Sequence, residues 1–262
     1  MTMLHFYKYQ GAGNDFVVFD NRSGAIHHQE PSWIQGICDR RFGVGADGLI
    51  LLQSHPDFDF EMVYYNADGQ PSSMCGNGGR CAVAFAKKLG IIRNETTFLA
   101  VDGPHYAHCS EEGSWVNLQM IDVSVLERDG EAWVLNTGST HYVSSVQNLS
   151  QLDVYNGGKA IRYNNTYAEK GINVNFIEEK DTGYTVRTYE RGVEDETLAC
   201  GTGVTAVALA MAKEKGLLGT HNTPISVRGG ALNVRFTFDG TTFTNVFLEG
   251  PATLVFEGDI QY

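Results

Sequence analysis

The sequence predicts an α+β fold of two similar halves, in each of which a curved, antiparallel or mixed sheet surrounds one buried helix. Three observations favour this fold. Short β-rich runs, separated by glycine and polar turn residues, fill most of the chain. Two long helical segments interrupt these runs, and each follows a Cys-Gly-x-Gly motif. The order of strands, motif and helix returns in the second half, which indicates an internal duplication.

The β-rich runs favour antiparallel or mixed pairing over a regular alternation of strands and helices, because several runs follow one another without a helix between them. The strands expected in the first half are residues 5–10, 16–21, 49–54, 60–66, 96–101 and 114–120. Those expected in the second half are residues 132–138, 141–146, 172–179, 183–191, 224–230, 232–240 and 242–250.

Two helices are expected at equivalent places. The first covers roughly residues 79–89 and ends before Gly90, and the second covers residues 204–215 and ends before Gly216. Both carry lysine in the last turn, where the helix dipole favours positive charge, and both are followed by the glycine that commonly ends a helix. The second helix has almost no polar face, so we expect it to be buried on most sides.

The composition limits the classes of protein to which the chain can belong. Of its 262 residues, 42% are hydrophobic and 11% are aromatic, which is enough to bury a substantial core. It has 31 acidic and 19 basic side chains, a net charge of −12, so we expect neither nucleic acid nor a membrane as a partner. No segment resembles a signal peptide or a membrane span, which predicts a cytoplasmic protein.

The cysteines point to reduced thiols. There are five, an odd number, and no two form a C-x-x-C pair, so we expect neither a disulfide framework nor a metal site. Cys38, Cys81 and Cys109 are interpreted as ordinary core or surface thiols. Cys75 and Cys200 differ, because each stands at the start of one of the two helices.

A cysteine before glycines at a helix start has two chemical uses. The N–H groups of the first helical turn lack partners and carry partial positive charge, so they bind an anion such as a carboxylate. The same positive potential stabilises a thiolate. Because glycine has no side chain, a ligand can approach the backbone closely at this position.

Two such cysteines, one in each half, suggest the inversion of a carbon that carries a hydrogen. If a pseudo-twofold axis relates the halves, the two helix starts face each other across a cleft and the two sulfurs flank one small ligand. Inversion requires a base on one face and an acid on the other, and a thiolate and a thiol can exchange these roles. The converging N–H groups would stabilise charge that develops on the substrate carboxylate.

Segments along nearly the whole chain resemble the diaminopimelate epimerase family, whose members interconvert LL- and meso-diaminopimelate for lysine and peptidoglycan synthesis. The most specific are YNADGQPSSMCGNGGRC (residues 65–81) and YERGVEDETLACGTG (residues 189–203). The other matching segments are residues 11–20, 40–52, 137–143, 171–176 and 250–260.

The resemblance implies two pseudo-symmetric halves, residues 1–122 and 123–249, with an active site in the cleft between them. It also implies that the C-terminal strand, residues 250–262, returns to the first half. The family uses no cofactor and no metal, and its substrate is the small molecule diaminopimelate. Some members are homodimers, so a homodimer is an expectation here.

The resemblance makes Cys75 and Cys200 the acid–base pair. Glu190 and Arg191 match the acid and base that engage the distal end of the substrate, which fits the preference of arginine for carboxylates and of glutamate for ammonium groups. The substrate-binding residues that it implies are Asn14, Asn66, Gly76, Asn77, Ser139, Asn173, Glu190, Arg191, Gly201 and Thr202. Gly76, Asn77, Gly201 and Thr202 would donate hydrogen bonds to the reacting carboxylate.

The chain departs from the family pattern at two positions. Ser139, Thr140 and His141 stand where the family often has Asn-Pro-His, and serine is shorter than asparagine and has no amide. Gly48 stands where some members carry glutamine, so no side-chain contact with substrate is expected there. His141 is interpreted as a buried packing or hydrogen-bonding residue.

Three alternatives use the same features. A proline or hydroxyproline racemase-like enzyme shares the plan of two cysteines but lacks the NADG and ERG runs in this form. A redox protein would join Cys75 and Cys200 in a switchable disulfide. A binding module would retain the cleft without chemistry, although binding alone requires neither sulfur. The sequence leaves open which cysteine is the resting thiolate, the oligomeric state and the extent of domain closure.

Overall fold

The computed structural model describes residues 3–27, 30–72 and 74–261. The chain divides into two compact units: unit 1 is residues 1–118 with residues 250–262, and unit 2 is residues 119–249. The division expected from sequence lies slightly later, after residue 122. Tyr262, the last residue of the expected C-terminal strand, lies outside the described residues.

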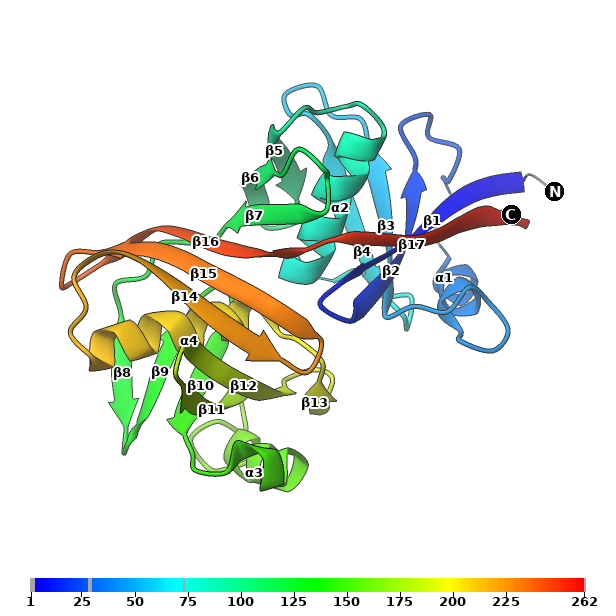
Figure 1. Ribbon diagram of the computed structural model, residues 1–262. Coiled ribbons are helices and arrows are strands. Elements are labelled where there is room, and N and C mark those ends of the chain that lie inside the picture. The colour runs from blue at the N-terminus through cyan, green and yellow to red at the C-terminus, as the bar shows by residue number, and fades with distance from the viewer. Residues whose placement is uncertain (1–2, 28–29, 73, 262) are drawn as a thin grey trace. The chain divides into compact units, whose positions relative to one another are not determined.

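The described residues of unit 1 form one set of paired strands and two helices (Figure 1). Neighbouring strands follow the order β17, β1, β2, β3, β4, β5, β6, β7. The pairs β2–β3 and β4–β5 are parallel and the other pairs are antiparallel. The elements are β1 (Met3–Gly11), β2 (Asn14–Asp20), α1 (Pro31–Cys38), β3 (Gly48–Gln53), β4 (Glu61–Asn66), α2 (Gly76–Lys88), β5 (Glu95–Ala100), β6 (Gly103–Cys109), β7 (Trp115–Gln119) and β17 (Thr253–Gln261).

Unit 2 is built in the same way. Its strands follow the order β8, β9, β10, β11, β12, β14, β15, β16, and the short strand β13 pairs with β12. The pairs β10–β11 and β12–β14 are parallel. The elements are β8 (Leu126–Asp129), β9 (Ala132–Asn136), β10 (Thr140–Ser145), η1 (Leu149–Gln151), α3 (Val154–Arg162), β11 (Asn173–Lys180), β12 (Gly183–Glu190), β13 (Asp195–Thr197), α4 (Gly201–Glu214), β14 (Gly219–Val227), β15 (Gly230–Phe238) and β16 (Phe243–Pro251).

The two units repeat one succession of strand pairings. In each, two antiparallel pairs precede a parallel pair, and an antiparallel pair then separates that from a second parallel pair. The first parallel connection contains α1 in unit 1 and α3 in unit 2, and the second contains α2 and α4. The repeated order confirms the predicted fold class of two similar α+β halves.

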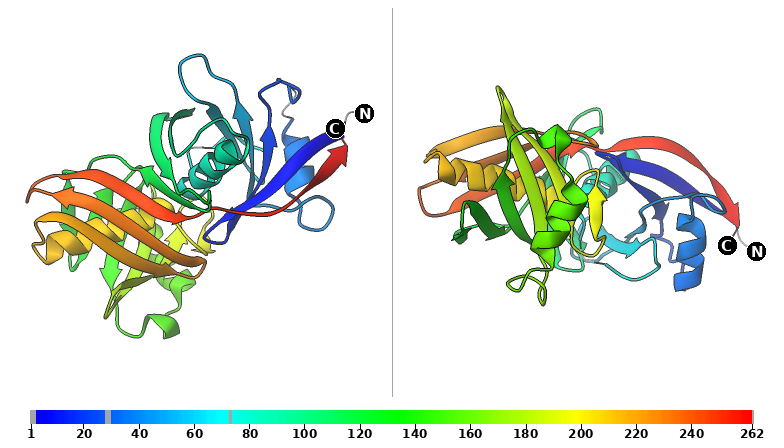
Figure 2. Two further views of the ribbon diagram at one scale, coloured as in Figure 1. Left: turned by 45° about the horizontal axis from the view of Figure 1, so that its top comes forward. Right: turned by 90° about the horizontal axis from the view of Figure 1, so that it is seen from below.

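The helices α2 and α4 form the centre of their units (Figure 2). All residues of α2 from Gly76 to Ala86 are buried, and it packs against β1, β2, β3, β4 and β6. In α4, Gly201 and the residues from Gly203 to Ala212 are buried, and the helix packs against β9, β10, β11, β14 and β15. Gly90 (φ 71°) and Gly216 (φ 62°) follow the two helices in the left-handed conformation, as their sequence positions predict.

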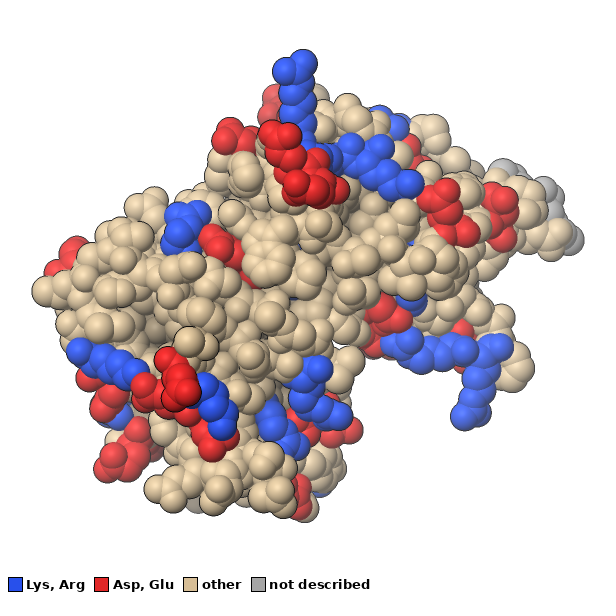
Figure 3. Space-filling view, in the orientation of Figure 1, with Lys and Arg blue, Asp and Glu red and all other residues tan. Residues whose placement is uncertain are grey.

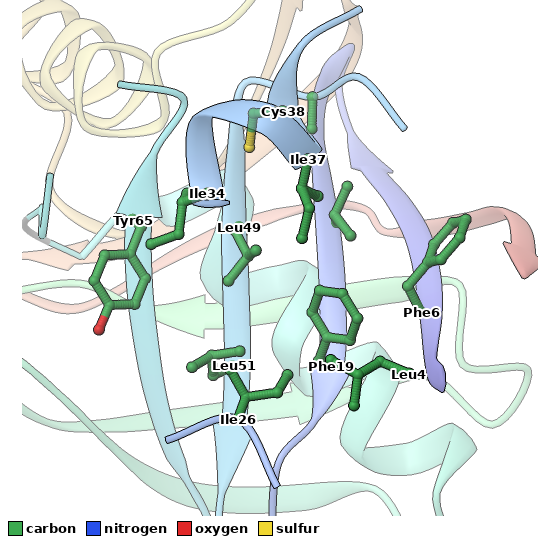
Figure 4. Close-up of a cluster of buried hydrophobic side chains, with 12 residues drawn as sticks. Leu4, Phe6, Phe19, Ile26, Ile34, Ile37, Cys38, Leu49, Leu51 and Tyr65 are labelled. Carbon is green, nitrogen blue, oxygen red and sulfur yellow. The ribbon is translucent and has the colours of Figure 1, made fainter. Parts of the chain in front are cut away.

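The shorter helices α1 and α3 pack on the sheet faces that α2 and α4 do not cover. Neither was expected from the sequence. In unit 1, Ile34 and Ile37 of α1 pack with Phe19, Leu49 and Leu51 in a buried cluster (Figure 4). In unit 2, α3 packs against β11 and β12. The sequence of α3 contains two adjacent glycines, which lower its helix propensity and hide it from pattern analysis.

The surface shown in Figure 3 carries acidic and basic side chains interspersed with one another, without a single large basic patch on that face. Within the described ranges, no helix has the length and apolar character needed to cross a membrane.

A buried polar network lies inside unit 2 on three neighbouring strands. His141 of β10, Asn175 of β11 and Thr188 of β12 are all almost completely buried. Asn175 Nδ2 lies 3.2 Å from His141 Nδ1, and the Thr188 hydroxyl donates to Asn175 Oδ1 at 2.9 Å. Such groups avoid the cost of burial because they bond to one another.

We predict that two glycine-to-alanine substitutions, one in α1 and one in α3, change the free energy of unfolding in opposite directions. A Cβ at position 158 would lie 2.3 Å from Tyr189 Cβ, whereas a Cβ at Gly36 would meet no atom within 4 Å. Gly158→Ala should therefore lower the free energy of unfolding by about 1–3 kcal/mol through overpacking. Gly36→Ala should raise it by about 0.5–1 kcal/mol, since alanine loses less entropy in a helix. Urea denaturation measures the free energy of unfolding of both variants. Equal changes in the two variants would contradict the difference in packing around Gly36 and Gly158.

We also predict a pH dependence that originates at His141. Burial, reinforced by the charge of Arg191, lowers the pKa of His141 from its ordinary value of 6.5 to about 3. Between these values the unfolded chain binds a proton that the folded state does not, so stability is greatest above pH 6.5 and falls as the pH drops. At pH 5 the loss from this residue should be about 2 kcal/mol relative to pH 7.

Denaturant titrations of the parent and of His141→Gln between pH 7 and pH 5 measure this contribution. Glutamine cannot titrate in this range, so the variant should show a shallower decline even if it is less stable at pH 7. Parallel declines in the two proteins would show that His141 does not cause the dependence.

Candidate active site

The two cysteines expected to carry the chemistry occupy the same position in their units. Cys75 is the N-cap of α2 (φ −104°, ψ 122°) and Cys200 is the N-cap of α4 (φ −113°, ψ 110°). Neither side chain makes a capping hydrogen bond. The backbone closes each first turn, since Gly79 N–H donates to Cys75 C=O at 2.7 Å and Val204 N–H to Cys200 C=O at 2.9 Å. The sulfur of each cysteine contacts a side chain of its own unit instead.

In unit 1, the Cys75 sulfur faces an amide oxygen. Cys75 Sγ donates to Asn14 Oδ1 at 3.5 Å, and Asn77 Nδ2 donates to the same oxygen at 3.3 Å. Asn14 Nδ2 donates to Asp47 Oδ2 at 2.6 Å. A carboxylate only accepts hydrogen bonds, so Asp47 fixes the orientation of the Asn14 amide and directs its oxygen toward Cys75.

Behind Asn14 lies a cluster of four charged side chains. Asp15 bonds to Lys8 at 2.7 Å and to Arg40 at 2.7 and 2.9 Å, and Arg40 also reaches Asp47 at 2.7 Å. Burial by itself would raise the pKa of the Asp15 carboxyl, but its bonds with Arg40 and Lys8 lower that pKa to about 2. The Asp15 carboxylate therefore holds the Arg40 guanidinium, which in turn bonds to Asp47.

In unit 2, the Cys200 sulfur faces a hydroxyl group. Cys200 Sγ lies 3.5 Å from Thr202 Oγ1, which lies 2.9 Å from His141 Nε2. Asn175 Oδ1 accepts from Thr188, so the amide group Nδ2 faces His141 Nδ1 and makes that nitrogen an acceptor. The neutral imidazole then carries its proton on Nε2 and donates it to Thr202. The Thr202 hydroxyl is left to donate to Cys200 Sγ.

A second group of predicted residues comes together in unit 2. Asn173 Nδ2 donates to Ser139 Oγ at 2.8 Å, and the Arg191 backbone N–H donates to Asn173 Oδ1 at 2.9 Å. Arg191 Nη2 also reaches Ser139 Oγ at 3.5 Å, while Nη1 donates to Lys170 C=O at 3.1 Å. Ser139 therefore accepts from both neighbours, and its hydroxyl proton can be donated to a ligand. Asn173 is buried, and the Arg191 residue is exposed.

The remaining predicted residues are placed as follows. Glu190 ends β12 and accepts a hydrogen bond from the Thr197 hydroxyl at 2.9 Å. Gly76 and Gly201 begin α2 and α4, so their N–H groups belong to the first helical turns. Asn66 ends β4, where its backbone bonds with Gln70. Across the described part of unit 1, no hydrogen bond joins the Asn66 side chain to Asn14 or to the cysteine turn.

Sequence reasoning did not identify Asp47, Asn175 and Thr188 as partners of the site. Asn175 stands two positions after Asn173 in the same β-run, where asparagine is unfavourable, and this second asparagine is the one available signal. Asp47 and Thr188 stand in ordinary settings for their residue types. Their roles depend on strand pairing, which brings distant residues together.

The other three thiols lie in the cores. Cys38, Cys81 and Cys109 are buried. Burial raises the pKa of Cys38 and of Cys81 to about 12, and it raises the pKa of Cys109 as well. These thiols therefore stay protonated, as expected of core residues. Among the residues that the structure describes, no cluster of three or more His, Cys, Asp or Glu side chains is suited to a metal ion.

Solved structures with the same fold share little sequence with this chain. A Bacillus anthracis phenazine biosynthesis protein of the PhzF family superposes with a TM-score of 0.78 at 13% identity, covering 100% of both chains. A probable proline racemase from Agrobacterium radiobacter superposes with a TM-score of 0.67 at 15% identity, covering 98% of this chain and 93% of the other. These similarities establish the fold.

Sequence comparisons identify the family. The family model described as diaminopimelate epimerase matches residues 6–126 and 133–255. The diaminopimelate epimerase of Flavobacterium psychrophilum is 53% identical over 258 residues, covering 98% of this chain and 100% of the relative. That of Chlorobaculum tepidum is 44% identical over 262 residues, covering 95% and 98%. The chain belongs to the diaminopimelate epimerase family.

Proposed function

We propose that this enzyme interconverts LL- and meso-diaminopimelate without a cofactor, with Cys75 and Cys200 as the acid and base at the α-carbon. The observation that carries the proposal is the equivalent placement of the two cysteines, each the N-cap of the central helix of its unit. The high identity to relatives named diaminopimelate epimerase supports the substrate. The proposal requires both sulfurs to reach one α-carbon from opposite faces.

The hydrogen-bond partners support different resting states for the two sulfurs. Asn14 Oδ1 can only accept, so it favours Cys75 as a thiol. The Thr202 hydroxyl accepts a hydrogen bond from His141 and can donate one to the Cys200 sulfur, so it favours Cys200 as a thiolate. In this assignment Cys200 is the first base and Cys75 is the first acid.

The proton transfers balance without any further reagent. The Cys200 thiolate takes the α-proton, and the electron pair of the broken C–H bond moves into the adjacent carboxylate. Cys75 then gives its thiol proton to the opposite face of the carbon. The product leaves an enzyme in which Cys75 is the thiolate and Cys200 the thiol, the form that accepts the other stereoisomer.

The helix starts supply the stabilisation that this reaction needs. Charge on the substrate carboxylate increases as the α-proton leaves, and N–H groups aimed at it lower the barrier. Gly76 and Asn77 begin α2, and Gly201 and Thr202 begin α4, so these residues are the proposed donors. The helix dipoles act in the same direction.

The group of Ser139, Asn173 and Arg191 is suited to the distal end of diaminopimelate, which carries a carboxylate and an ammonium group. Arg191 would bind the carboxylate, and Ser139 would add one hydrogen bond in place of the asparagine found in other members. Glu190 would bind the ammonium group, with Asn14 and Asn66 as further polar contacts. A site with both charges favours diaminopimelate over proline, which has no charged distal end.

The surroundings of the enzyme are part of the proposal. We infer a cytoplasmic location and a role in lysine and peptidoglycan synthesis, with the free amino acid as its substrate and a homodimer as its expected assembly. Neither nucleic acid nor a membrane is proposed as a partner, in line with the net charge of −12.

We predict that Cys75→Ala and Cys200→Ala each lower epimerisation by at least about 10²-fold, because each removes one proton-transfer group. The assay incubates the protein with LL-diaminopimelate in deuterated water under reducing conditions. It follows α-deuterium incorporation and stereoisomer composition together. The buried thiol variant Cys109→Ala is the control and should retain activity if it folds.

Three outcomes would contradict the proposal. Full activity of either single cysteine variant would exclude a two-base reaction. Absence of exchange and interconversion in the parent enzyme would exclude epimerisation of this substrate. Inversion of proline in its place would identify a racemase.

We further predict that Arg191→Gln lowers kcat/KM for LL-diaminopimelate by about 10–100-fold, mainly through KM, because a charge-assisted hydrogen bond to the distal carboxylate is lost. Ser139→Ala should have a smaller effect in the same direction. Arg93→Gln removes an exposed arginine of unit 1 and should leave both constants unchanged. Unchanged KM in Arg191→Gln would exclude the distal role.

A further inference from the structure

A buried arginine bonds to the helical turn that carries the candidate thiol and has no part in the function proposed above. Arg80 belongs to the central helix α2, and its side chain is fully buried, with 0% relative exposure. Burying a positive charge is costly unless the protein uses or compensates it. Burial lowers the pKa of Arg80, but a guanidinium remains charged at physiological pH. A negative charge near Arg80 would therefore offset the cost of its burial.

The guanidinium of Arg80 reaches back to the first turn of its own helix. Nη2 donates to Asn77 Oδ1 at 3.0 Å, and Nη1 donates to Gly76 C=O at 3.3 Å. Nε donates to Pro251 C=O at 3.4 Å. All three acceptors are neutral oxygens, and two of them belong to the residues that directly follow Cys75. Arg80 thus bonds to the turn that carries the thiol.

These bonds fix the orientation of the Asn77 amide. Because Oδ1 accepts from Arg80, Nδ2 points the other way, toward Asn14 Oδ1 at 3.3 Å. Asn14 is held from its far side by Asp47, and its oxygen is also the acceptor for Cys75 Sγ. A guanidinium at one end and a carboxylate at the other therefore align two amides, and the sulfur bonds to the oxygen between them.

The carboxylates near this row of hydrogen bonds are paired with cations other than Arg80. Asp15 pairs with Lys8 and Arg40, and Asp47 pairs with Arg40. The neighbouring thiol Cys81 remains protonated, because burial raises its pKa to about 12. Arg80 interacts electrostatically with Cys75 as well as with Cys81. A thiolate at Cys75 is thus the negative charge that Arg80 is placed to balance.

Strand β1 leaves room for this arrangement. A Cβ on Gly11 would lie 3.1 Å from Asn77 C=O, 3.3 Å from Arg80 Nη2 and 3.4 Å from Cys81 Sγ. Any larger residue would press on the guanidinium and on the helical turn at the same time. A side chain at position 11 would therefore displace the Arg80 guanidinium and the helical turn by a few tenths of an ångström.

We propose that Arg80 is a positioning residue for proton transfer at Cys75: its guanidinium orients Asn77 and, through Asn14, the thiol, and its fixed charge stabilises the thiolate that forms when Cys75 gives up its proton. The inference rests on the acid–base role proposed for Cys75. It adds a residue that contacts the turn behind the thiol and acts through its neighbours.

The test measures the thiol directly. The full-length enzyme is treated with iodoacetamide at a series of pH values, and alkylation of Cys75 is quantified by peptide mass spectrometry. Arg80→Met should raise the pH midpoint of Cys75 alkylation by about one unit, because a nearby positive charge is removed. Arg80→Lys keeps the charge and should return the midpoint close to that of the parent. Lys88→Met, at the exposed end of the same helix, should not change it.

Activity provides the second measurement. Arg80→Met should lower kcat for epimerisation by about tenfold or more with little change in KM, and Arg80→Lys should recover part of the loss. An unchanged midpoint in Arg80→Met would overturn the proposal. So would a midpoint in Arg80→Lys that rises by a full unit, and this variant decides the matter alone if Arg80→Met does not fold.

The alkylation midpoint is measured without diaminopimelate, so the two proposals can fail separately. A parent enzyme that does not act on diaminopimelate, together with a shifted midpoint in Arg80→Met, would refute the function and retain the electrostatic coupling. An active parent with equal midpoints in all variants would retain the function and refute the role of Arg80.

Discussion

The burial of one helix inside each sheet is the constraint on which the rest of this structure depends. The N–H groups in the first turn of a helix have no partner within the helix, and in a buried helix little water reaches them. They must therefore bond to a capping side chain or to a ligand. In both units the N-cap is a cysteine whose side chain does not cap. The N–H groups and the sulfur are thereby placed together, and the proposed reaction uses the former to bind an anion and the latter to transfer a proton.

The two units repeat their strand order but surround the sulfurs with different chemistry. The Cys75 sulfur bonds to an amide oxygen, whereas the Cys200 sulfur lies beside a hydroxyl that is backed by a neutral histidine. An acceptor favours the thiol and a donor favours the thiolate. The two similar units therefore differ in the chemistry around their cysteines, and the proposed reaction uses this difference to set one acid and one base at rest.

Ion pairs and buried polar groups hold this arrangement in place. In unit 1 the ion pairs among Lys8, Asp15, Arg40 and Asp47 hold Asn14 from one side, and Arg80 fixes Asn77 from the other. In unit 2 the network of Asn175, Thr188 and His141 determines the imidazole tautomer. Both networks orient neutral groups that contact the sulfurs, so the positions of the protons follow from hydrogen-bond direction.

The sequence by itself determined the features that depend on local patterns: the two central helices, their glycine ends, most strands, and the cysteines at the helix starts. It also identified the family, because the matching segments are contiguous. The helices α1 and α3 escaped prediction because they are short and glycine weakens the pattern of α3. Tertiary structure alone decided the partners of the sulfurs, since Cys75 and Asn14 are 61 positions apart, as are His141 and Thr202. Strand pairing sets such contacts, and no local pattern encodes which distant side chains it brings together.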